Sequence, residues 1–592
     1  MKIIRQDPPG GNFRNPAARF FLLCFLVYFG RNERSSSRLV YLTAGGLALA
    51  AYLWNQRNPA RKALEKRKGK VRKDLWPDIA RWVASTLFGL IVVGANYRMY
   101  MDDTPGHKAI TMLLLGAGGF TAASEGLKYA AVRMKRKQTA RIQWSQAFPW
   151  KAFLACFLLM AGLNLFLLFA CVYPGNICSD SLSQIKQILY GNYSNHHPFY
   201  HTMLIRVFFT LGMNLFHDIN AAVACFHLFE ILLLAAVFAL VVATMLQAGC
   251  RKLTAVFVFL WYWLMPFHIS FSFTMWKDTV YGAVICLFTV SLYRCVKESS
   301  HYRLVNIILL AVSALGFCIL RSNGMPAFVF FLLCFILMEG KKHFNIVLIL
   351  VWILMLSLVL KYPVLKSLNV AQPDTVESLS IPLQQMARVA YEDGSFTQSE
   401  RDYLEQVVSI RRMKEEYHPD VSDYIKNLIR YEGHQEVITL NQNAFLATWA
   451  SVVFHHPVLA LRAWIDQTYG YWNPCPSYWM LWMDGLYEEE GLKQTIYWEK
   501  GNELYHHYVG AFMSDNLVLR QAYNVGLHSW ILFFFLALAA MKKKKEALIA
   551  LPVVGLLLTL MIATPMCYEF RYAYPLYATL PIIIFALVEE KS

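Results

Sequence analysis

Residues 174–200, "PGNICSDSLSQIKQILYGNYSNHHPFY", form a polar island between two apolar runs. The island carries one acidic side chain, Asp180, followed by glutamines, a glycine and the adjacent residues His196 and His197 before a proline. Polar groups are costly in the hydrocarbon of a bilayer, so such a segment belongs in water or at the membrane surface. The side on which it lies decides how the rest of the chain is threaded.

The composition indicates the class of protein. Hydrophobic residues make up 57% of the 592 residues, and they come in long blocks. Many blocks are near the roughly 20 residues with which a helix crosses a bilayer. The sequence therefore predicts an all-α, polytopic membrane protein.

Positive charge is concentrated in short loops between the apolar blocks. The formal net charge is +17, and the basic loops are 61–73, 133–141, 251–252, 341–342 and 542–545. Cytoplasmic loops of membrane proteins carry such an excess of Lys and Arg. We therefore place these loops in the cytoplasm, and we expect membrane lipids and no nucleic acid as partners.

Threading the chain with these loops inside gives about fourteen transmembrane spans. They lie near 17–31, 39–55, 79–100, 109–131, 152–173, 218–247, 253–272, 278–295, 304–320, 325–340, 343–361, 525–541, 546–564 and 574–588. The expected protein is a multi-pass protein of a plasma membrane, with both termini in the cytoplasm.

The apolar segment 199–216 is not expected to cross. If it crossed, Arg251 and Lys252 would lie on the same side as Asp180, against the charge rule. Arg206 also falls in the middle of the segment, where a charge is costly in lipid. We expect an amphipathic helix at the outer surface, which places Asp180 and the regions 362–524 and 565–573 outside.

The predicted organisation has four parts. They are a four-helix membrane block (1–145), a membrane module (146–361) with its first outer loop at 174–217, a mainly helical extracytoplasmic domain (362–524) and three C-terminal spans (525–592). The third part contains a capping box at Thr397–Glu400, which indicates a helix start. It also contains an aromatic stretch, 468–487, typical of an interfacial belt, with a sugar-stacking or lipid-contacting surface as the alternative.

Ionisable residues gather at the outer ends of the predicted spans. They are Asp180, Lys277, Asp278, Arg321, Glu569 and Arg571. Each alone is typical of an ordinary interfacial charge that snorkels or pairs locally. Together they suit chemistry on an anionic substrate, because charges at apolar helix ends tend to mark a pathway or a site.

Transfer from a phosphate-linked donor needs a carboxylate base and cations or a metal on the departing phosphate. Asp180 fits the base, and Lys277, Arg321 and Arg571 fit the cations. His196 and His197 suit metal binding or hydrogen bonds to the substrate, but adjacent side chains point different ways, which disfavours a shared metal. A histidine before proline also commonly caps the helix that follows.

The motifs "DSLSQ" (180–184), "NHHP" (195–198), "WKD" (276–278), "RSNG" (321–324) and "EFRY" (569–572) are similar to those of a group of uncharacterised bacterial proteins. This pattern, with an acid soon after a span and a His-Pro before the next helix, resembles the GT-C superfamily of membrane glycosyltransferases. The resemblance covers roughly 146–592. It implies a GT-C-like core of seven spans with the catalytic aspartate in its first outer loop.

By this resemblance, the protein moves a sugar from a polyprenyl-phosphate donor to a hydroxyl of a cell-envelope glycan, lipid or protein. The transfer inverts the anomeric carbon outside the cell, with Asp180 as general base. Lys277, Arg321, Arg571, His196, His197 and Gln184 would bind the donor phosphate or substrate, with Asp278 and Glu569 as supporting acids. Ser181 stands where many members have a second acid, so a divalent cation, Mg²⁺ or Mn²⁺, stays an open question.

Two other functions remain open. A transporter or flippase of a lipid-linked glycan is also polytopic and carries charges near a cavity, although such sites lie near the midplane. A non-catalytic envelope assembly protein would depend as much on 1–145 and 362–524. The pairing of Cys178, Cys475 and Cys567, which lie in polar loops, cannot be assigned from the sequence.

Overall fold

The computed structural model describes residues 16–31, 38–57, 75–136, 144–297, 303–474, 488–513, 516 and 518–588. These residues form helices and no named strand, which confirms a helical protein. The chain divides into two compact units, 1–140 with 540–543, and 141–539 with 544–592. The predicted cytoplasmic loop 61–73 lies outside the described residues.

The first unit contains the four predicted helices of the N-terminal block. They are α1 (Pro16–Arg31), α2 (Arg38–Arg57), α4 (Trp76–Ala95) and α5 (Pro105–Arg136). Phe29 and Tyr41 stack between α1 and α2, with ring centroids 4.2 Å apart. Helices α4 and α5 pack closely at Gly89, where an added Cβ would lie 2.7 Å from the Gly116 carbonyl oxygen.

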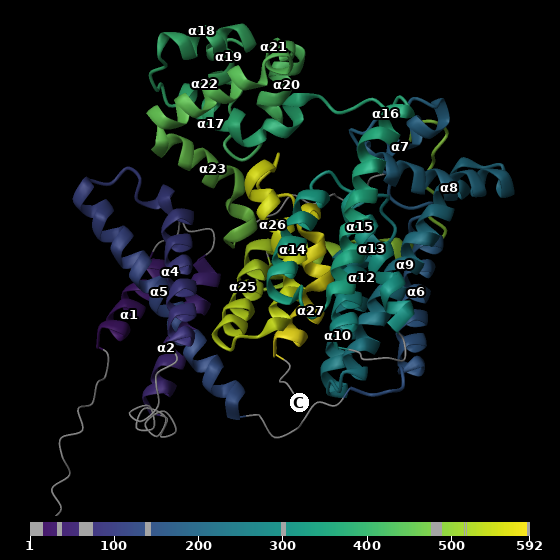
Figure 1. Cartoon of the computed structure of the whole chain (residues 1–592), viewed down its shortest axis with the longest axis horizontal. Helices are drawn as coiled ribbons and strands as arrows, with labels where there is room; N and C mark the ends of the chain where they lie inside the picture. The colour runs from purple at the N-terminus through teal and green to yellow at the C-terminus, as the bar shows by residue number, and fades with distance from the viewer. Residues whose placement is uncertain are drawn as a thin grey trace, which may run out of the picture. The chain divides into compact units, whose positions relative to one another are not determined.

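The second unit is built around a bundle with one continuous apolar core. Its long helices are α6 (Trp150–Cys171), α9 (Ile219–Gln247), α10 (Lys252–Leu264), α12 (Lys277–Lys297), α13 (Arg303–Ile319), α14 (Gly324–Glu339), α15 (Phe344–Val359), α25 (Val525–Met541), α26 (Leu551–Ala563) and α27 (Tyr574–Val588). Figure 1 shows these helices running side by side. Helices this apolar on every face are typical of membrane spans.

Eight helical segments among the described residues are long and apolar enough to cross a membrane. They are Trp76–Ala95, Pro105–Met134, Trp150–Cys171, Ile219–Gln247, Lys277–Lys297, Phe344–Ser367, Lys545–Ala563 and Phe570–Val588. The other six predicted spans correspond to apolar helices of 10–17 residues. A membrane-embedded protein is therefore supported, whereas the count of fourteen and the sidedness stay predictions.

The bundle has two chemically different ends. At one, named here the polar-loop end, the loop after α6 is bonded to the segment before α12 through Asn176 N and Phe273 O, 2.8 Å apart. At the opposite end of α12, Lys297 pairs with Glu546 at 2.9 Å, and Lys545 pairs with Glu339 at 2.5 Å. Among the described residues, the basic groups around Glu339 and Glu546 thus lie at the end of α12 opposite to the polar first loop.

The first loop contains two helices, α7 (Ser179–Tyr190) and α8 (Phe199–Phe216). In Figure 1, α8 extends sideways from the bundle, whereas α6 and α9 run along it. It is not among the membrane-span candidates found in the described residues. Val207, Leu211 and Leu215 share one face of α8 and are exposed, as expected for a helix lying on a membrane surface.

Region 362–524 divides into a helical subdomain and segments packed on the bundle. After the π-helical turn η2 (Leu360–Val364) and α16 (Leu365–Ser367), the subdomain comprises η3 (Thr375–Leu379), α17 (Ser380–Tyr391), α18 (Gln398–Val407), α19 (Ile410–Glu415), α20 (Asp423–Tyr431), α21 (Gln435–Leu440) and α22 (Gln442–His455). It has its own apolar core. The predicted capping box at Thr397 and Glu400 is confirmed.

The chain then returns to the bundle. In α23 (Pro457–Trp472), Trp464 Nε1 donates to the Met561 carbonyl at 2.8 Å. In α24 (Glu499–Met513), the Asn502 amide donates to the Cys171 carbonyl at 2.8 Å. Tyr471, from the predicted aromatic belt, is buried in the bundle core, while 475–487 lies outside the described residues.

Candidate functional site

Asp180 is held by a loop that is fastened at several points. Met275 N donates to the Asn176 carbonyl at 3.1 Å, and the Ser181 hydroxyl donates to the Met275 carbonyl. Gly175 has φ +115°, and a Cβ there would lie 2.3 Å from His227 Cδ2, so only glycine fits. Asp180 then falls in the first turn of α7, where the helix dipole favours a carboxylate.

Two cations from distant parts of the chain share one oxygen of Asp180. Lys277 Nζ, at the start of α12, lies 3.1 Å from Asp180 Oδ2. Arg571 Nη1, in η6 (Phe570–Ala573), lies 2.9 Å from the same oxygen. His197 Nδ1 lies 3.4 Å from Lys277 Nζ and 3.9 Å from Asp180 Oδ2. We name these four residues the Asp180 cluster.

The cluster is partly open to solvent. The exposed fractions of its side chains are 26% for Asp180, 16% for Lys277, 14% for Arg571 and 9% for His197. Burial raises the pKa of Asp180, but Lys277 and then Arg571 outweigh burial and hold it well below its usual range. Burial and the charge of Lys277 lower the pKa of His197 to about 3. At neutral pH the cluster therefore holds two cations, one carboxylate and a neutral imidazole.

A second layer of charges supports Arg571. The Arg321 guanidinium lies 2.7 Å from Asp278 Oδ1 and 4.7 Å from the centre of the Tyr572 ring. Arg571 lies 5.2 Å from the centre of the same ring. Glu569 Oε1 is 3.4 Å from Arg571 Nε, and burial raises the pKa of Glu569 to about 7.

The structure thus brings Asp180, Lys277, Arg571 and His197 together, with Arg321, Asp278 and Glu569 behind them. His196 is exposed, and no ion pair links it to Asp180. Gln184 is buried, and its Nε2 donates to Thr202 Oγ1 at 2.8 Å. This bond fastens α7 to α8, so Gln184 positions the first loop.

Helix capping by His197 is not observed. The N-cap residue of α8 is Pro198, and Asn195 Oδ1 accepts the backbone N–H of Phe199 at 3.1 Å. Asn195, four residues before the first residue of α8, satisfies this free N–H, which leaves the imidazole of His197 for the cluster.

Two of the predicted loop cysteines, Cys178 and Cys567, are buried. Trp276 Nε1 donates to Cys178 Sγ, so Cys178 acts as a packed, weakly polar group. Cys567 Sγ accepts from Gly470 N at 3.2 Å. Cys475 lies outside the described residues, so the pairing of these cysteines stays open.

Sequence reasoning missed a buried polar pair in α9. His227 Nδ1 lies 2.9 Å from Glu230 Oε2, and both side chains are fully buried. A second bond joins His268 Nδ1 and the Tyr574 hydroxyl at 2.9 Å. The signal was the glutamate within the apolar run "FHLFEILLL", because a charge inside a span is costly and tends to be functional.

The charged side chains nearest to Asp180 Oδ2 are cations. Metal sites for Mg²⁺ or Mn²⁺ gather several oxygen ligands, whereas the nearest charged groups to Asp180 Oδ2 are Lys277 and Arg571. In the part of the chain that the structure describes, no group of three or more His, Cys, Asp or Glu side chains is arranged to hold a metal ion.

The fold and the charged cluster define a helical membrane-embedded protein with a polar site at one end of its bundle. The chain belongs to a family described as "Family of unknown function (DUF6020)", which matches residues 190–592. The matched range contains His197, Lys277, Arg321 and Arg571, and it begins ten residues after Asp180. No curated protein and no solved structure matches the chain.

Proposed function

We propose that the protein is a membrane glycosyltransferase of the GT-C type. It moves a sugar from a polyprenyl-phosphate donor to a hydroxyl of an envelope glycan, lipid or protein on the extracytoplasmic face. The observation that carries this proposal is one carboxylate, on the first helix after a span, shared by cations from two other helices. A base beside two cations is what transfer from a phosphate leaving group requires.

In the proposed reaction, the acceptor oxygen bonds to the anomeric carbon as the bond from that carbon to the phosphate oxygen breaks. The configuration at this carbon inverts. The acceptor proton passes to Asp180, and the bonding electron pair leaves with the polyprenyl phosphate, which gains one negative charge. Lys277 and Arg571 stabilise that developing charge, and Arg321 lies behind them as a third cation.

The same arrangement explains how Asp180 becomes a base. In the free enzyme both cations hold its pKa low, so the carboxylate is a weak proton acceptor. A donor phosphate competes for Lys277 and Arg571 and draws them away from Oδ2. The pKa of Asp180 then rises, and the base is activated only when the donor is bound.

A lipid-linked glycan transporter is the second candidate. It is favoured by the fully buried pair His227 and Glu230, because buried ionisable groups inside spans often line transport pathways. The charged cluster, however, lies at a bundle end, where transfer chemistry can meet the acceptor.

The test compares surface glycans and lipid-linked sugars in cells that carry the wild-type protein, Asp180→Asn or no copy. Asp218→Asn is the matched control, because Asp218 caps α9 in the same loop and asparagine caps equally well. We expect Asp180→Asn, but not Asp218→Asn, to lack a glycan residue and to accumulate its lipid-linked donor. Normal glycans with Asp180→Asn, at equal protein level, would contradict the proposal. Lipid-linked glycan trapped on the cytoplasmic leaflet of cells without the protein would favour the transporter.

A further inference from the structure

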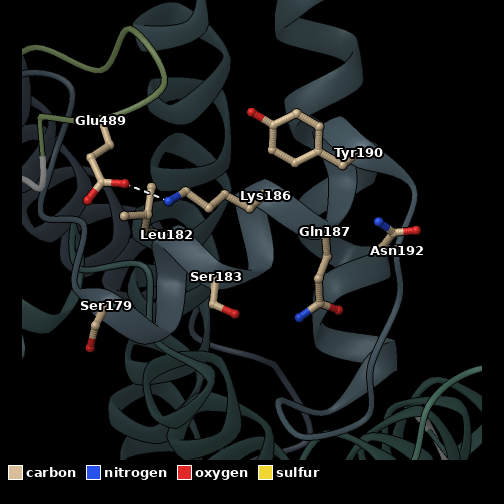
Figure 2. A pocket seen from close by; sticks show the side chains of 8 residues that line it. All are labelled: Ser179, Leu182, Ser183, Lys186, Gln187, Tyr190, Asn192 and Glu489. Atoms are coloured by element: carbon tan, nitrogen blue, oxygen red, sulfur yellow. Dashed lines mark hydrogen bonds and ion pairs between the residues drawn. The ribbon is translucent and has the colours of Figure 1, made fainter.

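An open cavity of about 460 Å³ lies along α7, and its lining includes Ser179, the residue before Asp180. It is lined by Ser179, Leu182, Ser183, Lys186, Gln187, Tyr190, Asn192 and Glu489. Figure 2 shows Lys186 of α7 reaching toward Glu489, which comes from another segment of the chain. Its volume falls within the roughly 300–1,000 Å³ of small-molecule sites.

The surface that lines the cavity is mostly apolar, with polar side-chain tips placed among the carbon atoms. Seven of the eight lining side chains carry a hydroxyl, amide or charged group, and only Leu182 is purely apolar. The ring of Tyr190 is held in place because its hydroxyl donates to Glu490 Oε2 at 2.6 Å. A sugar offers both hydroxyl groups and a flat apolar face, which match this mixture of polar tips and an aromatic ring.

The charge of the cavity disfavours an anionic ligand. Lys186 and Glu489 are the charged residues in its lining, and they pair with each other at 2.5 Å. The cavity therefore carries no net charge from its lining, whereas the neighbouring cluster has two cations for one carboxylate. A neutral ligand suits the cavity, and the phosphate suits the cluster.

The geometry of α7 connects the two sites. Side chains advance about 100° per residue around a helix, so Asp180 lies at the edge of the face that carries Ser183 and Gln187. Residues three apart have Cβ atoms about 5–6 Å from each other. A ligand in the cavity can thus present one hydroxyl to Asp180, while Ser194 N donates to Gln187 Oε1 at 2.9 Å and fixes that edge.

We propose that this cavity binds the acceptor as a neutral, polyhydroxylated glycan. The assignment to the acceptor rests on the proposed glycosyltransferase function. The site selects an acceptor by its sugar hydroxyls and orients one of them toward Asp180, on the side of the carboxylate away from the donor phosphate.

The test measures binding to the full-length protein in lipid nanodiscs. The probes are a panel of neutral oligosaccharides, including maltotriose and triacetylchitotriose, with inorganic phosphate as the anionic probe. Ser183→Trp fills the cavity from α7, and Asn192→Trp fills it from the following loop, in case either variant fails to fold. Leu189→Trp is the matched control, because Leu189 is exposed on the same helix but does not line the cavity.

We expect at least one oligosaccharide to bind, and either cavity-filling variant to weaken it by about tenfold or more. Leu189→Trp should leave oligosaccharide binding unchanged. Phosphate binding should be weakened by Lys277→Met and unaffected by the two cavity-filling variants. No binding by any oligosaccharide, binding unaffected by both cavity variants, or phosphate binding weakened by Ser183→Trp would each overturn the proposal. If the cavity binds glycan but Asp180→Asn cells have normal glycans, the glycan site stands and the transferase proposal falls.

Discussion

The charge balance at Asp180 gives the sharpest prediction about the cluster. Asp180→Asn removes the carboxylate that Lys277 and Arg571 share, while keeping the shape of the side chain. At 3.1 and 2.9 Å, with an effective dielectric constant near 20, each attraction amounts to about 5 kcal/mol before desolvation. Breaking a buried pair costs about 3–5 kcal/mol, and the partial exposure of these groups reduces this to roughly 2–3 kcal/mol.

The double variant Asp180→Asn with Lys277→Met tests whether that cost arises from unpaired cations. Removing Lys277 in the absence of Asp180 relieves its repulsion from Arg571. We therefore expect the double variant to be no less stable than Asp180→Asn alone, with a coupling energy of about 1–3 kcal/mol. Lys361→Met is a suitable control, because Lys361 is a half-buried cation that donates to the Cys318 carbonyl at 3.5 Å.

The measurement is the free energy of unfolding of the full-length protein by SDS titration in detergent micelles, followed by tryptophan fluorescence. Destabilisations that add to within about 0.5 kcal/mol would show that Asp180 and Lys277 do not interact. That result would refute the ion-paired cluster and, with it, the argument that a donor phosphate activates Asp180.

Three further predictions concern the loops around the site. Burial raises the pKa of Glu569 from 4.5 to about 7. Between these two pH values the folded state keeps a proton that the unfolded state has lost, so the free energy of unfolding falls as pH rises through this range. In SDS titrations, the free energy of unfolding should therefore differ less between pH 5 and pH 8 for Glu569→Gln than for the wild-type protein. In the same titration, Gly175→Ala should destabilise the protein far more than Gly191→Ala. Both glycines have a positive φ, but only at Gly175 would the new Cβ collide with an imidazole, at 2.3 Å. Equal effects of the two substitutions would contradict the packing of the first loop. A cysteine placed at the exposed Asn192 should react with a membrane-impermeant reagent in intact cells, and a cysteine at Lys342 should react only after permeabilisation. Labelling is measured relative to the protein that carries only its native cysteines. The opposite result would reverse the predicted sidedness.

The local elements followed from the sequence because their signals are local. Apolar blocks of bilayer length predicted the bundle helices, and Arg206 with the basic loop 251–252 predicted that α8 is not a span. The capping box at Thr397 and Glu400 placed the start of α18 correctly, because it depends on four consecutive residues. The alternation of charge between loops also predicted that the candidate site residues lie at one end of the bundle.

The contacts within the site depended on packing between distant segments. Asp180 and Arg571 are 391 residues apart, and no periodic pattern tells which of several cations at a bundle end reaches one carboxylate. Packing also gives the two adjacent histidines different surroundings, because His197 lies beside Lys277 whereas His196 is exposed. The side chain of Gln184 contacts Thr202 of α8 for the same reason. The sequence by itself determined the helices, their charge asymmetry and the candidate residues, because these depend on short-range patterns and on transfer into lipid. The tertiary structure alone decided which charges share an oxygen and where the α7 cavity lies, because side-chain contacts depend on how the helix ends converge.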